Sequence, residues 1–364
     1  MKVTRLSASH YRNLSEIEIY PQEGVNIIYG ENAQGKTNLL ESIWMFTGCR
    51  SFRGAKDAEL VSLQNEAARL EMDFYAGGRD QNASLLLDEK RHAVLNGIKL
   101  SSATRLMGEF RAVVFSPVHL SLVKEGPAQR RRFLDLALSQ LKPRYASILS
   151  QYNRALSQRN ILLKDIPYHP ELTDTLAIWD DRLSALGAQI IYQRRSYVER
   201  MQESAVSFYH GLSRGREELY LFYASSMESR TVAGLTQELR EHLTKFRRED
   251  LKNGSTSVGP HRDDLEILVD RLSARVYGSQ GQQRSCALSM KLSEAVLIRE
   301  ITGEQPVALL DDVMSELDAG RQDYILNHIE GWQVFITCCE PSSLLRLCAG
   351  KTFSLRGGCL EETA

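Results

Sequence analysis

The sequence predicts an α/β fold in which a sheet-rich domain is divided by an inserted helical arm. Up to about residue 115, short apolar runs such as Val25–Tyr29 alternate with turns, as β-strands do. From Ala128 to about Gly211, apolar residues recur every three or four positions with charges between them, which indicates long amphipathic helices. β-like runs then return. We therefore expect the sheet domain at 1–115 and 254–364 and the arm at 116–253.

Composition excludes several classes of protein. The chain has 364 residues, of which 43% are hydrophobic and 25% charged, enough for two domains. Its longest apolar runs, such as Val307–Leu310, fall far below the roughly 18 to 20 residues of a bilayer-spanning helix, and no secretion signal precedes them. The six cysteines lack metal-ligand spacing, so we expect them to be reduced packing residues. We expect a cytoplasmic protein with no membrane partner.

The helical arm is expected to contain an antiparallel pair of helices. A polar break around residues 164–174, which contains Pro167 and Pro170, separates the first helical pattern from the second. Pro143 lies inside the first pattern, where a proline is expected to kink the helix.

A glycine-rich loop follows the strand predicted at Val25–Tyr29. Gly30, four intervening residues, Gly35, Lys36 and Thr37 stand between that strand and a predicted helix, which is the context of a phosphate-binding P-loop. The glycines let backbone N–H groups converge on a phosphate, the lysine supplies a positive charge, and the threonine hydroxyl ligates Mg²⁺. We assign the whole loop to ATP binding: Gly30, Glu31, Asn32, Ala33, Gln34, Gly35, Lys36, Thr37 and Asn38.

A second motif supplies the acids that a P-loop ATPase needs. The apolar run Val307–Leu310 ends in Asp311 and Asp312. We predict that Asp311 holds Mg²⁺ through water, and that Asp312 orients or deprotonates the attacking water. With Lys36, these two carboxylates form the predicted catalytic set.

A third motif lies between the first two. Ser279, Gly281 and Gln282 belong to a serine- and glycine-rich turn that precedes a predicted helix. Helix N-termini bind anions, and one nucleotide needs only one P-loop. A second such helix start therefore suggests a nucleotide carried by another copy of the chain, with these three residues contacting it.

These motifs, together with the turn at Leu317-Asp318, have the order found in ABC-type ATPases. The stretch Tyr11-Arg12-Asn13-Leu14 and the split of the ATPase domain by helices move the resemblance toward the SMC-like branch. Three further stretches resemble the RecF family of bacterial recombination mediators: FSPVHLSLVKEGPAQRRRFLD (115–135), STSVGPHRDDL (255–265) and YGSQGQQRS (277–285). The resemblance covers essentially the whole chain. Where transporters carry a histidine after the last core strand, this chain has Thr337.

The resemblance implies an ABC-type, SMC-like ATPase domain split by a helical arm domain. It implies a weak DNA-linked ATPase that dimerises when ATP is bound, acts in recombinational repair and replication restart, and works with RecO and RecR at gapped DNA. Arg12 is a candidate contact to the phosphates or the base of the nucleotide; the alternative is a surface arginine at a strand–turn junction.

Two basic clusters are candidate DNA contacts. Arg130, Arg131 and Arg132 open the first arm helix, where the helix dipole disfavours cations, so something should offset that cost. They either contact DNA phosphates or form a structural cluster paired with carboxylates. Arg247 and Arg248 form a weaker patch, for which the alternative is a solvated face. His261 has either a switch role or a role in a structural turn.

Two other functions share part of these motifs. The motor subunit of an ABC transporter would have all three, but its P-loop and acids lie in one compact domain, whereas Lys36 and Asp311 are 275 positions apart here. A small-molecule kinase would not need the turn at Ser279. Both are therefore less well supported than an ATP-gated DNA clamp.

Overall fold

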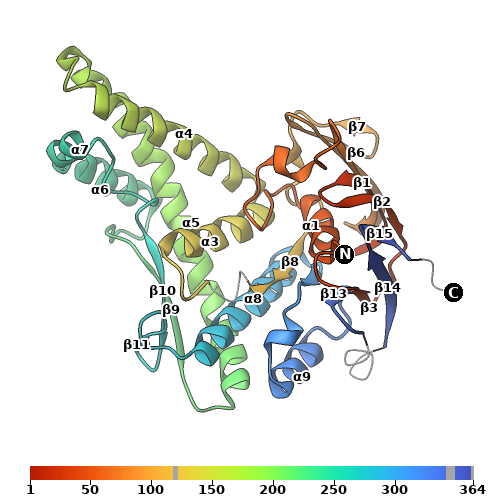
Figure 1. Cartoon of the computed structure of the whole chain (residues 1–364). Coiled ribbons are helices and arrows are strands. Elements are labelled where there is room, and N and C mark those ends of the chain that lie inside the picture. The colour runs from red at the N-terminus through yellow and green to blue at the C-terminus, as the bar shows by residue number, and fades with distance from the viewer. Residues whose placement is uncertain (118–121, 342–348, 362–364) are drawn as a thin grey trace.

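Two six-stranded sheets, a smaller three-stranded sheet and a group of long helices make up the described part of the fold (Figure 1). The computed structural model describes residues 1–117, 122–341 and 349–361. The sheets lie together on one side of the molecule, and a hairpin of two long helices projects away from them on the other side.

The first sheet is antiparallel and has the order β2-β1-β4-β5-β6-β7. In most of its strands buried and solvent-facing residues alternate, as expected for a sheet with one covered face. Gly77 and Gly78, at φ 62° and 75°, form the turn between the antiparallel strands that end at Ala76 and begin at Arg79. The strands are β1 (Lys2–Tyr11), β2 (Leu14–Ile19), β4 (Ala68–Ala76), β5 (Arg79–Leu87), β6 (Arg91–Leu95) and β7 (Ile98–Lys99).

The second sheet has the order β15-β14-β3-β13-β12-β8, and every pair in it is parallel except β14 with β15. The predicted strands Val25–Tyr29 and Val307–Leu310 are confirmed as two of its members. The strands are β3 (Val25–Tyr29), β8 (Ala112–Phe115), β12 (Val307–Leu310), β13 (Val334–Cys338), β14 (Gly350–Arg356) and β15 (Cys359–Leu360).

Successive residues of the parallel strands enter two different cores. Leu309 packs with helix α1 (Lys36–Met45) and the antiparallel sheet, whereas Leu310 packs with helix α8 (Gln280–Thr302) and the arm. Ile28 and Ile27 divide in the same way. This division follows from the two-residue period of a strand. The parallel sheet is therefore covered on both faces, and its carboxyl ends are left as the edge where loops gather.

The described residues of the arm form the helices α3 (Pro127–Leu141), α4 (Pro143–Asp165), α5 (Leu176–Ser213), α6 (Val232–Lys245) and α7 (Arg247–Asn253). The antiparallel pair predicted around the break at 164–174 is confirmed as α4 and α5. The expected kink at Pro143 is wrong, because the chain breaks there instead. Lys142 leaves the helical region at φ −136° and ψ 89°, as residues before proline do, and Pro143 then starts α4.

A third sheet of three strands was not expected. It has the order β11-β10-β9, with β9 (Leu219–Ala224), β10 (Asp264–Val269) and β11 (Leu272–Ser273). β10 was predicted as part of the ATPase sheet, but it pairs antiparallel with β9, which follows the arm helix α5. This pairing ties the arm to the segment that leads into α8.

The remaining elements are short. They are helix α9 (Ala319–His328) and 3-10 helices at Asp57–Leu60, Ala103–Leu106, Pro170–Thr175 and Met314–Glu316. Within the described ranges, no helix combines the length and the apolar character needed to cross a membrane, not even the 38-residue α5.

Candidate nucleotide site

The predicted P-loop runs from the end of β3 to the start of α1, and two of its glycines are required by their surroundings. Gly30 has φ 152°, and a Cβ there would lie 2.3 Å from the carbonyl oxygen of Leu355. Gly35 has φ 109°, and its Cβ would lie 2.8 Å from Asn13 Oδ1. Both conformations disfavour other residues. The loop therefore keeps a tight path close to the neighbouring strand and turn.

Lys36 is nearly buried, at 4% exposure, and its ammonium group is directed back into the loop. Nζ donates to the carbonyl oxygens of Gly30 at 2.7 Å and Glu31 at 2.9 Å. No side chain caps the start of α1, and its first turn has no acidic residue. The unpaired N–H groups of that turn and the lysine therefore create a positive pocket suited to a phosphate.

Three side chains meet beside this loop: Thr37 in α1, Asp311 directly after β12, and Thr337 in β13. Thr37 Oγ1 donates to Asp311 Oδ1 at 2.7 Å, and Thr337 Oγ1 donates to the same oxygen at 3.1 Å. β3, β13 and β12 are adjacent in the sheet, so their carboxyl ends bring the loop, Thr337 and Asp311 together. Thr337 was noticed in the sequence only as a departure from histidine. Its hydroxyl holds the carboxylate of the second motif.

The carboxylate of Asp311 contacts the hydroxyl of the P-loop threonine, which makes it a candidate ligand for Mg²⁺. Burial, and then the charge of Asp312, raise the pKa of Asp311, while the hydrogen bond from Thr37 opposes this shift. Mg²⁺ in nucleotide sites is held by one or two protein oxygens together with phosphates and water. Thr37 and Asp311 fit that donor set, and the described residues contain no cluster of three metal-binding side chains that would suggest another ion.

Asp312 has the backbone conformation of a turn rather than of a strand. Its φ is 49°, and its N–H donates to Thr337 Oγ1 at 2.8 Å. Aspartate tolerates the left-handed region better than most residues. The chain therefore turns directly after β12, and Thr337 holds both the side chain of Asp311 and the backbone of Asp312.

The N-terminal turn at Arg12-Asn13 contacts the loop and its helix. Arg12 forms a two-bond ion pair with Glu41 on α1, at 2.5 and 3.2 Å, and Glu41 is fully buried. Asn13 donates to the Ala33 carbonyl at 3.0 Å and accepts from Asn38 at 2.6 Å. In this structure Arg12 is thus paired inside the protein rather than directed into open solvent.

Arg53 is a site residue that the sequence reasoning missed. Its Nη1 donates to Asn38 Oδ1 at 2.9 Å, and its charge lowers the pKa of Asp311, against the larger effect of burial. The side chain is exposed at the mouth of the loop. It lies outside all three motifs, so only the folded arrangement identifies it.

The turn at Ser279 caps α8 and is satisfied within itself. Ser279 Oγ accepts from the Gln282 N–H at 3.2 Å, and the Ser279 N–H donates to Gln282 Oε1 at 2.7 Å, which is a capping box. Gln282 also donates to Glu217 at 2.9 Å, and Gly281 is half-buried beside Arg321. Within the three described ranges, no hydrogen bond joins this turn to the P-loop of the same chain.

The structure pairs most of the candidate DNA-binding arginines inside the protein. Arg130 is 4% exposed and forms a two-bond ion pair with Asp264, at 2.8 and 2.6 Å. Arg131 and Arg132 donate to backbone carbonyls. Arg247 pairs with Asp180 at 2.9 Å, whereas Arg248 is exposed. For the cluster 130–132, these contacts favour the structural alternative.

His261 is a partly buried, neutral ring. Its Nε2 donates to the Thr256 carbonyl at 3.0 Å, and Nδ1 accepts from Tyr152 Oη at 2.8 Å. Burial is the main cause that lowers the pKa of His261 from 6.5 to about 4. These contacts favour the role in a structural turn.

We expect the stability of the protein to fall as His261 becomes protonated. Between pH 6.5 and about 4, His261 is protonated in the unfolded chain but remains neutral in the folded protein. The free energy of unfolding therefore decreases as pH falls through this range. A shift of this size corresponds to about 3 kcal/mol. Urea midpoints measured across this range for the protein and for His261→Gln should diverge, with the variant less sensitive to acid. If the urea midpoints of the two proteins changed with pH in the same way, His261 would not be the group that is kept neutral by folding.

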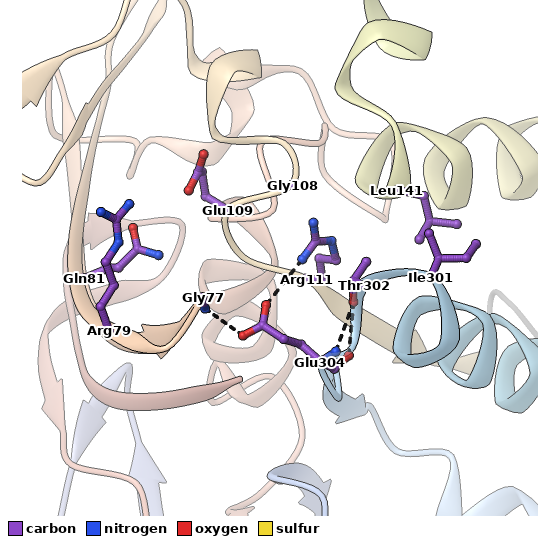
Figure 2. A pocket seen from close by; sticks show the side chains of 10 residues that line it. All are labelled: Gly77, Arg79, Gln81, Gly108, Glu109, Arg111, Leu141, Ile301, Thr302 and Glu304. Carbon is purple, nitrogen blue, oxygen red and sulfur yellow. Dashed lines mark hydrogen bonds and ion pairs between the residues drawn. The ribbon is translucent and has the colours of Figure 1, made fainter.

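A cavity of about 530 Å³ lies away from the nucleotide site, between the β4–β5 turn and the end of α8 (Figure 2). Glu304 lies at its edge, where it accepts from the Gly77 N–H at 2.7 Å and forms a 3.7 Å ion pair with Arg111. These bonds join the first sheet to α8. None of the residues that line this cavity belongs to the predicted site, so it does not compete with the P-loop as the nucleotide site.

The chain is similar to known proteins along nearly its whole length. The family model described as the RecF/RecN/SMC N-terminal domain matches residues 2–348. A solved structure described as the recombination mediator protein RecF with ATP in the RecFOR pathway is similar, with a TM-score of 0.91, 39% identity, and coverage of 100% of this chain and 98% of that one. The Smc head domain of Pyrococcus furiosus, at 14% identity and a TM-score of 0.55, shares the fold.

Curated relatives give the same result. The DNA replication and repair protein RecF of Caldanaerobacter subterraneus subsp. tengcongensis is 41% identical over 363 residues, 97% of this chain and 98% of its own. The RecF protein of Lachnoclostridium phytofermentans is 39% identical over 340 residues, 93% of this chain and 92% of its own. The chain therefore belongs to the RecF family of DNA replication and repair proteins, within the SMC-type ATPases.

Proposed function

We propose that this chain is an ATP-gated DNA-binding switch of recombinational repair, and that it binds ATP with Mg²⁺ at Gly30–Asn38. The observation that carries the proposal is the meeting of Thr37, Asp311 and Thr337 beside a loop whose lysine and helix N-terminus attract phosphate. Lys36 would leave the carbonyls of its own loop for the phosphates. Thr37 and Asp311 would hold the metal, which neutralises charge on the phosphates when bound.

Hydrolysis would rely on Asp312. Its carboxylate follows that of Asp311 at the end of β12, and its backbone is fixed by Thr337. A carboxylate at this position can accept a proton from the attacking water. Aspartate is one methylene shorter than glutamate, so we propose slow turnover, which suits a switch with a long-lived closed state.

Two copies would share each nucleotide. The turn at Ser279 is exposed and preformed, so a second chain can present it to the P-loop of the first. The residues before it also expose apolar surface: Val276 is 67% and Tyr277 70% exposed. Such surface beside an anion-binding helix start supports a contact that is covered in a dimer. ATP binding would then close the dimer, and hydrolysis would reopen it.

DNA binding is proposed from the family and from local charge. The similar structures are described as members of the RecFOR pathway, which supports RecO and RecR as partners at gapped DNA. The net charge of −1 requires that any DNA surface be local. Of the five arginines proposed as DNA contacts, Arg248 is the one that the structure leaves exposed. We propose that it contributes to DNA binding, in the cytoplasm where the chromosome lies.

Binding to gapped and to blunt DNA, at two salt concentrations and with ATP or ADP, tests this proposal. We expect tighter binding with ATP, a preference for gaps, and loss of the ATP effect in Lys36→Ala, because that variant lacks the phosphate-binding charge. Weaker binding at the higher salt would report phosphate contacts.

Sedimentation of the same samples provides the second measurement. We expect the mass to double with ATP in the unchanged chain and to remain that of one chain in Lys36→Ala. If the mass remained that of one chain in all conditions, the proposal of a nucleotide site shared by two chains would be wrong. If the DNA affinity were equal with ATP and ADP, the proposal that ATP controls DNA binding would be wrong.

A further inference from the structure

Helix α3 begins with three arginines at the end where the helix dipole repels cations, and the structure shows how each one is used. Arg130 makes the largest set of bonds. Besides its two-bond ion pair with Asp264, it donates to the carbonyls of Val123 at 3.4 Å and Glu125 at 2.7 Å. Two of these four bonds fix the start of the helix against Asp264, the first residue of β10, and the other two hold the segment that precedes the helix.

Arg131 makes a second bond to the same strand start. Its Nη1 donates to the Asp263 carbonyl at 2.7 Å. β10 leads through β11 into the turn at Ser279. The first two arginines therefore hold the hairpin that leads into this turn.

Arg132 turns in the opposite direction, toward the segment that follows α1. Its Nη2 donates to the carbonyls of Ser51 at 2.6 Å and Phe52 at 3.3 Å. Gly54 is packed against the same guanidinium, because a Cβ there would lie 3.0 Å from Arg132 Nη1. Arg132 thus bonds to the backbone that precedes Arg53 and packs against Gly54, which follows it.

The segment that Arg132 holds is in direct contact with the nucleotide site. Arg53 donates to Asn38 in the P-loop, and its charge acts on Asp311. Ser51 Oγ donates to the buried carboxylate of Glu41, the partner of Arg12. A shift of this segment would therefore move a cation at the mouth of the loop and disturb a buried ion pair.

We infer that Arg132 is a positioning residue for the ATP site: it holds the 51–54 segment so that Arg53 faces the bound phosphates. This inference rests on the proposed function, since it requires ATP at the P-loop. With Arg130 and Arg131 bonded to the start of β10, one helix end then connects the P-loop of a chain to the hairpin that carries the Ser279 turn. Movement of the arm would reach both halves of the shared site through α3.

The type of bonding at Arg132 makes a conservative variant informative. Both hydrogen bonds come from a single nitrogen, Nη2, so a lysine ammonium can replace part of the interaction. At Arg130, by contrast, three nitrogens are engaged in a fork, which lysine cannot reproduce.

The test is a double-mutant cycle on the affinity for ATP, measured by titration calorimetry with Mg²⁺ present, beside the urea midpoint of each variant. We expect Arg132→Ala and Arg53→Ala each to weaken ATP binding about tenfold, the size of one lost hydrogen bond to a charged group. The double variant should be no weaker than Arg53→Ala alone, because Arg132 acts through Arg53. Arg132→Lys should recover most of the affinity, and Arg154→Ala, at an exposed arginine on α4, should leave it unchanged.

Two results would overturn the inference: unchanged ATP affinity in folded Arg132→Ala, or additive losses of about a hundredfold in the double variant. If the alanine variant does not fold, Arg132→Met, which keeps the apolar stem and lacks the donor, takes its place in the cycle. Failure of the unchanged chain to bind ATP would remove the proposed function itself, and this inference with it. If the unchanged chain binds ATP but the cycle shows no coupling between Arg132 and Arg53, only this inference is overturned.

Discussion

ATP turnover should fall by about 100-fold or more when Asp312 is replaced with asparagine, while ATP still binds. The amide cannot accept a proton from water, but it has the same size and keeps the backbone N–H that Thr337 holds at 2.8 Å. The closed dimer should therefore accumulate with ATP. Steady-state phosphate release and sedimentation, measured on the same preparation, check the two halves of this expectation.

Asp323→Asn is a matched control for that variant, because Asp323 is exposed on α9 and the change of charge is the same. We expect it to turn over ATP at the rate of the unchanged chain. If Asp312→Asn also kept that rate, the proton would have another acceptor and the role of Asp312 would need to be reassigned. If it lost ATP binding as well, its charge would be acting on the metal site together with Asp311.

Replacing Arg159 with leucine should lower the free energy of unfolding by about 3–5 kcal/mol, because it leaves the buried carboxylate of Asp250 without its charged partner. Arg159 is fully buried on α4. It donates to Asp180 at 2.7 Å, to Asp250 at 2.7 Å and to Thr256 at 2.9 Å. Asp250 is also fully buried, whereas Asp180 retains Arg247 as a second partner. The urea midpoint of the variant measures this loss.

The double variant Arg159→Leu with Asp250→Leu separates the loss of charge balance from the loss of packing. It removes one charge of each sign and leaves the Arg247–Asp180 pair intact. We expect the double variant to be more stable than Arg159→Leu alone, because an apolar pair can replace a buried ion pair at little cost. A double variant less stable than either single one would show that the hydrogen bonds, rather than the charges, stabilise this part of the arm.

The local sequence pattern was sufficient to predict much of the fold. The run Val25–Tyr29, with the glycines and Lys36 after it, predicted a strand, a loop and a helix, and the structure has all three. Thr37 and Asp311 were each assigned to Mg²⁺ from their own motifs, and in the structure their side-chain oxygens lie 2.7 Å apart. The strand, loop and helix could be predicted because each is determined by a short continuous stretch of sequence.

Contacts between distant segments could not be predicted in this way. β9 and β10 pair across some forty intervening residues, so neither strand shows in its own sequence which sheet it joins. Thr337 and Arg53 act on Asp311 only because the sheet and the segment after α1 bring them there. The arginines at 130–132 have the same composition as a DNA-binding patch, and only their partners distinguish a structural cluster from one.

The capping box of the Ser279 turn has a consequence for how the protein would behave in a cell. The turn is satisfied by its own serine and glutamine, so if two copies share each nucleotide as proposed, a lone chain would fold with only its own half of each reaction centre formed. Catalytic output per molecule would then rise with abundance, since two molecules must meet before either can act. The copy number of the protein, and any scaffold that gathers it on a damaged chromosome, would set the threshold for activation.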